Sequence, residues 1–251
     1  MPHLTYSVED RVATLMLNNP PQNRIDEQMA DELAEALDAI GRSDARAVLL
    51  RADGTDFSFG GDIVTWPDLD ARELRTLFER YMSVFNRFER LPLPVIAAVH
   101  GLCFGGGFEL ALACDLIVAD KMTRFCFPEL RLGLIPGFGG IPRLKRDIGN
   151  GVVRDLLLTG RSINATKALA IGLASQVAAE GEALSLARHT AAQITKFDRA
   201  TAAAAKRFIK SLPAEELRRE IDIFCQLFAQ PAVMQGLRKF VEDTGAHPYL
   251  P

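Results

Sequence analysis

The chain has 251 residues, of which 48% are hydrophobic and 24% are charged, so it can bury a sizeable core and lacks the composition of a disordered protein. This length fits one large domain, or one domain with a helical extension. The 29 basic and 32 acidic residues give a net charge of −3 and are mixed along the chain, which argues against a nucleic-acid-binding protein.

Cysteine use and the first residues indicate the compartment. The four cysteines form no CxxC pair and are too few for a disulfide scaffold of this length, so we expect reduced, buried thiols. The N-terminus lacks the basic start and apolar run of a signal peptide. Residues 95–119 are mostly apolar, but they contain Glu109, Asp115 and a glycine cluster, which predicts buried core rather than a membrane span. We therefore expect a cytoplasmic protein.

The first half of the chain alternates between strand and helix patterns. Residues 12–17 form a β-type run closed by a turn at 18–21, and Asp26 is the expected N-cap of a helix with apolar residues at helical spacing up to Ile40. Residues 47–50 and 94–99 are fully apolar, and an amphipathic helix is predicted between them over 74–91. Strands without polar alternation indicate parallel β-α-β units that are covered on both faces.

The second half is predicted to be mainly helical. A helix at 110–114 and a strand at 116–119 are followed by helix patterns at 152–158, 165–171, 182–194, 200–212 and 215–228. The sequence contains no internal repeat and no low-complexity linker. We expect a β/α core over roughly the first 180 residues, with a helical C-terminal part packed on it or on a neighbouring chain.

Two glycine-rich segments follow apolar strands, at residues 56–63 and 100–110. Glycines between a strand and a helix leave backbone N–H groups exposed, and such groups suit an anion or a developing oxyanion. The spacings of the dinucleotide-binding, phosphate-binding and nucleophile-elbow motifs are absent, and the four histidines are scattered, so no metal site is predicted. Tight turns and close helix–strand packing are the structural alternative.

Two acids lie beside these glycines. Glu109 follows Gly106 by three residues in an apolar helix, where it either complements the helix dipole or is a buried carboxylate with a raised pKa suited to proton transfer. Glu129 follows Pro128. Taken alone, its local sequence favours a surface ion pair with Arg131 or Arg124.

Together these residues resemble the enoyl-CoA hydratase/isomerase (crotonase) superfamily. Its motifs occur in the family's order in residues 20–23, 57–63, 96–115, 127–129, 132–140, 158–160 and 165–177. The resemblance implies an α/β fold with a crotonase-like β/α spiral core of ββα repeats over residues 1–195, responsible for acyl-CoA binding and catalysis. It also implies a helical C-terminal region over 196–251 for oligomerisation and active-site cover, and a homotrimer or a dimer of trimers.

The resemblance further implies an acyl-CoA substrate whose enolate oxygen is stabilised by the backbone N–H groups of Gly61 and Gly106. Glu109 matches the position that helps to activate a water, and Glu129 the position that delivers a proton to the α-carbon. We expect syn hydration of a 2-enoyl-CoA, with coenzyme A as part of the substrate and no metal or other cofactor. The alternatives are a Δ3,Δ2-enoyl-CoA isomerase, which relies on Glu129 alone, and a non-catalytic acyl-CoA-binding member.

Several positions depart from the family pattern. Phe59 stands where a small residue is usual, Phe127 where a smaller or polar residue is usual, and Phe138 lies in the glycine turn. With Trp66 they are predicted to shape the acyl pocket for a short, branched or cyclic group; plain core packing is the alternative. For coenzyme A, the resemblance points to the backbone near Asp62 and Ile63, and to Arg24 and Lys239 as partners of the phosphates. Either basic residue could instead be a solvated surface charge, and Asp62 could cap the next helix.

Overall fold

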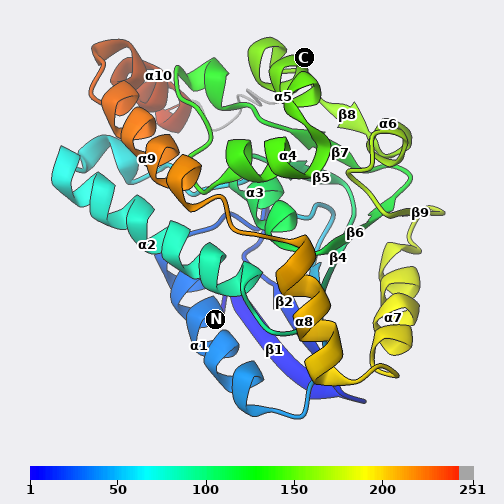
Figure 1. Ribbon diagram of the computed structural model, residues 1–251. Helices are drawn as coiled ribbons and strands as arrows, with labels where there is room; N and C mark the ends of the chain where they lie inside the picture. Colours follow the sequence, from blue (N-terminus) through cyan, green and yellow to red (C-terminus); the bar gives the residue numbers. More distant parts are fainter. Residues whose placement is uncertain (243–251) are drawn as a thin grey trace.

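A computed structural model describes residues 1–242, apart from the side chains of Lys239 and Glu242. The end of the predicted C-terminal region, residues 243–251, lies outside this range. The fold is α/β, with a six-stranded main sheet and a small second sheet (Figure 1). In spatial order, the main sheet consists of β1 (Leu4–Glu9), β2 (Val12–Leu17), β3 (Ala47–Ala52), β4 (Val95–Val99), β6 (Leu116–Asp120) and β9 (Gln176–Ala178). Only the β1–β2 pair is antiparallel; the other neighbours are parallel.

The second sheet gives the chain its spiral. It contains β5 (Leu102–Phe104), β7 (Arg124–Cys126) and β8 (Ile163–Asn164), and the first two are parallel. Strand β4 of the main sheet is followed at once by β5, and β6 is followed at once by β7. Each turn therefore places one strand in each sheet before the chain continues into a helix, which is the ββα repeat that the sequence predicted.

Helices cover both faces of the main sheet (Figure 1). They are α1 (Glu27–Arg42), α2 (Ala71–Glu89), α3 (Gly106–Ala113), α4 (Gly140–Ile148), α5 (Asn150–Thr159), α6 (Ala165–Ala170), α7 (Ala183–Ile194), α8 (Arg199–Ile209), α9 (Ala214–Phe228) and α10 (Pro231–Glu242), with 3-10 turns η1 (Trp66–Asp68) and η2 (Glu129–Leu132). Alternate strand residues serve opposite faces. Leu49 and Ile96 pack with α7, whereas Val48 and Leu50 belong to the large core that also holds the apolar faces of α1 and α2.

Helix starts follow local sequence signals. The Asp26 carboxylate accepts a hydrogen bond from Met29 N at 2.8 Å, so it is the N-cap of α1 as predicted. Asp70 and Glu73 form a capping box that begins α2 three residues before the predicted start. The predicted helix at 200–212 instead ends at Ile209, because Lys210 leaves the helical conformation and its ammonium group binds the carbonyls at the end of α3.

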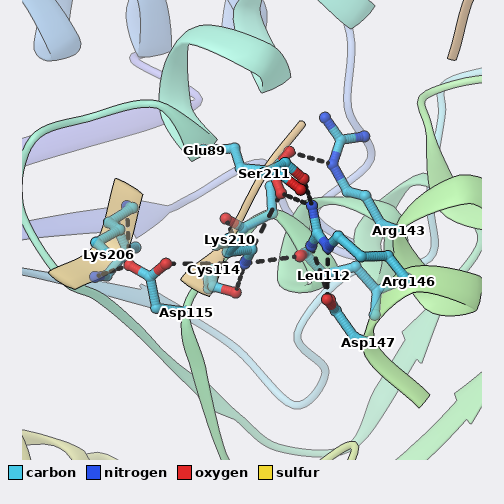
Figure 2. A network of polar contacts seen from close by, with 12 residues as sticks. Glu89, Leu112, Cys114, Asp115, Arg143, Arg146, Asp147, Lys206, Lys210 and Ser211 are labelled. Atoms are coloured by element: carbon cyan, nitrogen blue, oxygen red, sulfur yellow. Dashed lines mark hydrogen bonds and ion pairs between the residues drawn. The ribbon is translucent and has the colours of Figure 1, made fainter. Parts of the chain in front are cut away.

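A buried charge network ties α8 to the core (Figure 2). Lys206 Nζ lies 2.8 Å from the Asp115 carboxylate and donates to Leu93 O at 2.9 Å. Asp115 also accepts from Val95 N at 2.7 Å, at the start of β4. Lys210 is close to both Asp115 and Glu89, with N–O distances of 3.9 Å. The network therefore joins the C-terminal helices to the central strands.

The long apolar stretch at residues 95–119 is core, as predicted. It folds into β4, β5, α3 and part of β6, and most of its side chains are buried. Within residues 1–242, no helix is both long and apolar enough to cross a membrane.

Candidate active site

The two glycine-rich segments lie against each other. An isolated bridge joins Ser58 to Cys103, and Phe104 N donates to Ser58 O at 2.9 Å. This pairing brings the backbones after β3 and β5 so close that a Cβ atom on Gly60 would lie 2.9 Å from Gly106 N. A side chain at this position would clash, and the φ of +100° is also one that glycine favours.

Gly61 N and Gly106 N, the two predicted oxyanion donors, are neighbours. A Cβ atom on Gly106 would lie 3.1 Å from Gly61 N. Gly106 is the first residue of α3, and its N-cap Gly105 has no side chain to accept a hydrogen bond. Within residues 1–242 neither amide has a hydrogen-bond acceptor. Two unpaired amides, one of them at a helix N-terminus, thus border one cavity.

The cavity has a volume of about 40 Å³ and is walled by glycines, aromatic rings and two carboxyl groups. Both acids predicted from the sequence, Glu109 and Glu129, border it together with Gly61 and Gly106. A single water needs roughly 10–15 Å³ on this kind of measure, so the space holds only a few water-sized groups. The site therefore combines hydrogen-bond donors and titratable acids in a small apolar chamber.

Glu109 lies in the first turn of α3 and is 2% exposed. Its Oε1 atom accepts hydrogen bonds from Phe138 N and Gly140 N, both at 2.8 Å. Burial raises the pKa of Glu109 to about 7, while these amides and the Arg143 guanidinium lower it in part. A carboxyl group with this pKa can exchange protons near neutral pH, as a general base must.

Glu129 is the first residue of η2. Its Oε2 atom is buried and has no hydrogen-bond partner within the described part of the chain. Burial, and the neighbouring Glu109, raise the pKa of Glu129 well above its ordinary range. The surface ion pair with Arg131 or Arg124 that the local sequence favours is not formed. A protonated acid with an unused oxygen facing a cavity is suited to donating a proton.

Aromatic rings fill much of the space around the carboxyl groups. Phe138 packs against Trp66, Phe78 and Tyr81, with centroid distances of 6.5, 5.1 and 4.8 Å. Two of its ring atoms would lie 2.8 Å from a Cβ atom on Gly106, so the ring is directly beside that amide. Among the predicted pocket aromatics, Phe59, Trp66 and Phe138 border the cavity.

Phe127 requires a correction, because it does not border the cavity. Its ring packs on Phe108 at a centroid distance of 4.7 Å and is fully buried. A Cβ atom on Gly140 would lie 2.8 Å from the same ring, so Phe127 supports the start of α4. Plain core packing, the alternative considered for these phenylalanines, describes this one.

The predicted coenzyme A contacts are only partly described. Ile63 borders the cavity, whereas Asp62 accepts a weak turn contact from Val64 N at 3.4 Å and does not cap a helix. Arg24 donates to Gln22 Oε1 at 2.8 Å, and its guanidinium lies 5.6 Å from the Phe240 ring centroid. Lys239 belongs to α10, but its side chain lies outside the described part.

Sequence reasoning missed three residues near the site. Phe78 of α2 and Phe224 of α9 border the cavity and stack at a centroid distance of 4.0 Å. Glu220 of α9 is 4% exposed, and its carboxylate accepts hydrogen bonds from the backbone amides of residues 139 and 141. The available signal was its position on the apolar face of the helix, between Leu217 and Phe224, where an acid is unusual. Within residues 1–242, no group of His, Cys, Asp and Glu has the arrangement of a metal site.

Comparison with known proteins shows which family and fold the chain resembles. The sequence profile of the enoyl-CoA hydratase/isomerase family matches residues 7–247. The chain is 34% identical over 246 residues to crotonyl-CoA hydratase of Syntrophomonas wolfei, covering 95% of each chain. It is 37% identical over 191 residues to short-chain-enoyl-CoA hydratase of Clostridium acetobutylicum, covering 74% of this chain and 72% of that one.

Solved structures show the same architecture. An enoyl-CoA hydratase/isomerase from Xanthobacter autotrophicus superimposes with a TM-score of 0.87 at 27% identity, covering 96% of this chain and 93% of that chain. Pseudomonas aeruginosa DspI gives a TM-score of 0.81 at 29% identity, covering 91% and 96%. The chain therefore belongs to the enoyl-CoA hydratase/isomerase family and has the crotonase fold.

Proposed function

We propose that this protein is an enoyl-CoA hydratase that adds water syn across the double bond of a 2-enoyl-CoA thioester. The observation that carries the proposal is that two acids, Glu109 and Glu129, border one cavity together with two unpaired amides. The two acids differ in their hydrogen bonds, since Glu109 accepts from two amides and one oxygen of Glu129 is unpaired. That difference supports separate roles as base and acid.

In the proposed reaction the thioester oxygen accepts hydrogen bonds from Gly61 N and Gly106 N. Glu109 removes a proton from water as the water oxygen bonds to the β-carbon, and the electrons of the double bond pass to the thioester oxygen. The enolate then collapses as Glu129 delivers a proton to the α-carbon, so one water is added and no electron is gained or lost. Each oxyanion donor contributes about 3 kcal/mol to such a step. Coenzyme A enters as part of the substrate, and the reaction uses no metal or further cofactor.

The acyl group is proposed to be short. The cavity of about 40 Å³ leaves little space beyond the reacting carbons, and Phe138 occupies a position beside the Gly106 amide. Two relatives named for hydration of crotonyl-CoA and of short-chain enoyl-CoA support the same choice. We also expect a homotrimer or a dimer of trimers, which a native mass of three or six times the 27.6 kDa chain would identify.

A panel of enoyl-CoA thioesters tests the proposal. We expect the protein to hydrate crotonyl-CoA and to hydrate longer straight-chain thioesters more slowly. The loss of absorbance of the conjugated enoyl group monitors the reaction. Double-bond migration of a 3-enoyl-CoA without any hydration would identify the protein as an isomerase that uses Glu129. Saturable binding of acyl-CoA with no turnover of any thioester would make it a non-catalytic binding member.

A further inference from the structure

A third buried carboxylate, that of Glu220 on α9, lies at the N-terminus of α4. Its Oε1 accepts from Gly139 N at 2.6 Å, and its Oε2 accepts from Ile141 N at 2.9 Å. Both carboxylate oxygens are therefore used by backbone amides. Glu220 does not border the cavity, so it acts through the chain rather than by touching the substrate.

Glu220 and Glu109 bind alternate amides of one turn. Glu109 accepts from the amides of residues 138 and 140, and Glu220 from those of 139 and 141. The local sequence creates this need, because the N-cap Gly139 has no side chain that could accept from the first amides of α4. The start of α4 is thus capped by carboxylates from two other helices, α3 and α9.

The charged groups around this turn come from four elements. Arg143 of α4 is fully buried and donates to Phe138 O at 2.8 Å. The Arg143 guanidinium also pairs with the Glu89 carboxylate of α2 at 2.7 Å, so this pair links the turn to α2. Glu109 of α3 and Glu129 of η2 complete the set. Among the groups nearest to the turn, Arg143 is therefore the cation that faces both Glu109 and Glu220, and burial together with the neighbouring Glu109 raises the pKa of Glu220 well above its ordinary range.

We propose that Glu220 is a positioning residue that fixes the turn at residues 138–141 on Glu109 and thereby sets the basicity of that carboxylate. This inference rests on the proposed role of Glu109 as the base for hydration. With Glu220 in place, the amides of 138 and 140 remain directed at Glu109, and their hydrogen bonds favour the ionised carboxylate that acts as the base. Through Glu220, α9 thus contributes to catalysis from the C-terminal helical region, although this side chain does not border the cavity.

The test compares Glu220→Gln with wild type, using Glu215→Gln as the control because Glu215 is an exposed acid of the same helix. Glu220→Gln should weaken the amide hydrogen bonds that favour ionised Glu109, so the acid limb of kcat/KM for crotonyl-CoA should move to higher pH by about one unit. Loosening of the turn should lower kcat about tenfold, while KM changes less than about threefold, since misplaced catalytic groups lose rate rather than binding. Glu215→Gln should match wild type in all three.

Each outcome decides the point. Wild-type kcat and an unmoved acid limb in Glu220→Gln would overturn the proposal, and so would a loss of folding in both Glu220→Gln and Glu220→Asp. If only Glu220→Gln fails to fold, Glu220→Asp, whose shorter side chain holds the turn less well, should lower kcat and move the acid limb to higher pH; wild-type kcat would contradict the role. Absence of hydration by the wild-type protein in the same assay would instead remove the proposed function itself.

Discussion

Glu109 and Glu129 share one cavity, but the surrounding backbone treats them differently. Glu109 accepts two hydrogen bonds from the start of α4, whereas Glu129 Oε2 has no partner among residues 1–242. Burial raises the pKa of both, and the amide contacts hold that of Glu109 to about 7. Two carboxyl groups whose proton affinities are separated in this way can act as base and acid in one reaction.

The pH dependence of wild-type hydration should be bell-shaped. Activity should fall below about pH 7 because Glu109 takes up a proton and can no longer act as base, and fall at high pH because Glu129 loses its proton. kcat/KM measured against pH checks this. In Glu129→Gln the residual activity should lack the high-pH limb, and a limb that persists would assign it to another group.

Replacement of Glu109 by Gln should stabilise the protein in a pH-dependent way. The pKa in the folded state, about 7, exceeds the ordinary value of 4.5, so the folded state keeps a proton that the unfolded chain loses. Wild-type stability therefore falls as the pH rises from about 4.5 through about 7, by about 3 kcal/mol from this group, and the Gln variant lacks that loss.

Thermal unfolding at pH 5 and pH 8 measures this effect. The Tm of Glu109→Gln should exceed that of wild type by about 6 °C more at pH 8 than at pH 5. Glu216→Gln is the control, since Glu216 is an exposed acid paired with Lys145. If the Tm difference between Glu109→Gln and wild type were equal at both pH values, the folded protein would not raise the pKa of Glu109.

At the scale of elements, the site depends on where α4 begins. Its first amides are bound by Glu109 and Glu220, its Arg143 side chain holds Phe138 O, and Phe127 packs beneath Gly140. The Phe138 side chain projects from the same turn over the Gly106 amide. One turn therefore controls both the base and the space left for the acyl group.

Phe138→Ala should enlarge the acyl pocket. Removal of the ring should raise the ratio of kcat/KM for a ten-carbon enoyl-CoA to that for crotonyl-CoA by about tenfold, since the vacated space admits about two further methylenes at about 0.8 kcal/mol each. Phe127→Leu is the matched control, because that ring is buried but does not border the cavity. An unchanged ratio in Phe138→Ala would show that another wall limits chain length.

Much of the fold and of the candidate site could be predicted from the sequence. The same physical reasons explain which elements and residues were missed or misplaced. Apolar strands and capped helices such as α1 carry strong local signals, and the glycine segments with Glu109 and Glu129 carry the family resemblance. Helix α4 was not predicted, because it starts in a glycine-rich run and is capped by acids from distant helices. Phe127 was placed wrongly, since the sequence does not tell which way a side chain just after the short strand β7 points.

At the scale of the whole molecule, the C-terminal helices are joined to the core through charge. Lys206 is 7% exposed and lies between Asp115 and Leu93 O, and Lys210 binds the end of α3 (Figure 2). α9 then continues from this anchor and contributes Glu220 and Phe224 to the surroundings of the site. The helical region over 196–251 is thus part of the same packed structure as far as residue 242.

Loss of the Lys206 charge should destabilise the protein strongly. Lys206→Met leaves Asp115 buried without its closest cation, which should lower the free energy of unfolding by about 3 kcal/mol. Urea unfolding followed by circular dichroism measures this. Lys196→Met serves as the control, because Lys196 is an exposed lysine whose side chain is bonded only to Gln193. Equal midpoints for the two variants would show that the buried pair contributes no stability.

The central claim is that Glu109 and Glu129 act on one water opposite the amides of Gly61 and Gly106. Its most direct test is the rate of crotonyl-CoA hydration by Glu109→Gln, measured beside its rate of double-bond migration with a 3-enoyl-CoA. The account predicts that hydration falls about a thousandfold, because the general base is lost. Any migration catalysed by wild type should fall less than about tenfold, since Glu129 remains. Hydration within about threefold of wild type would contradict the account.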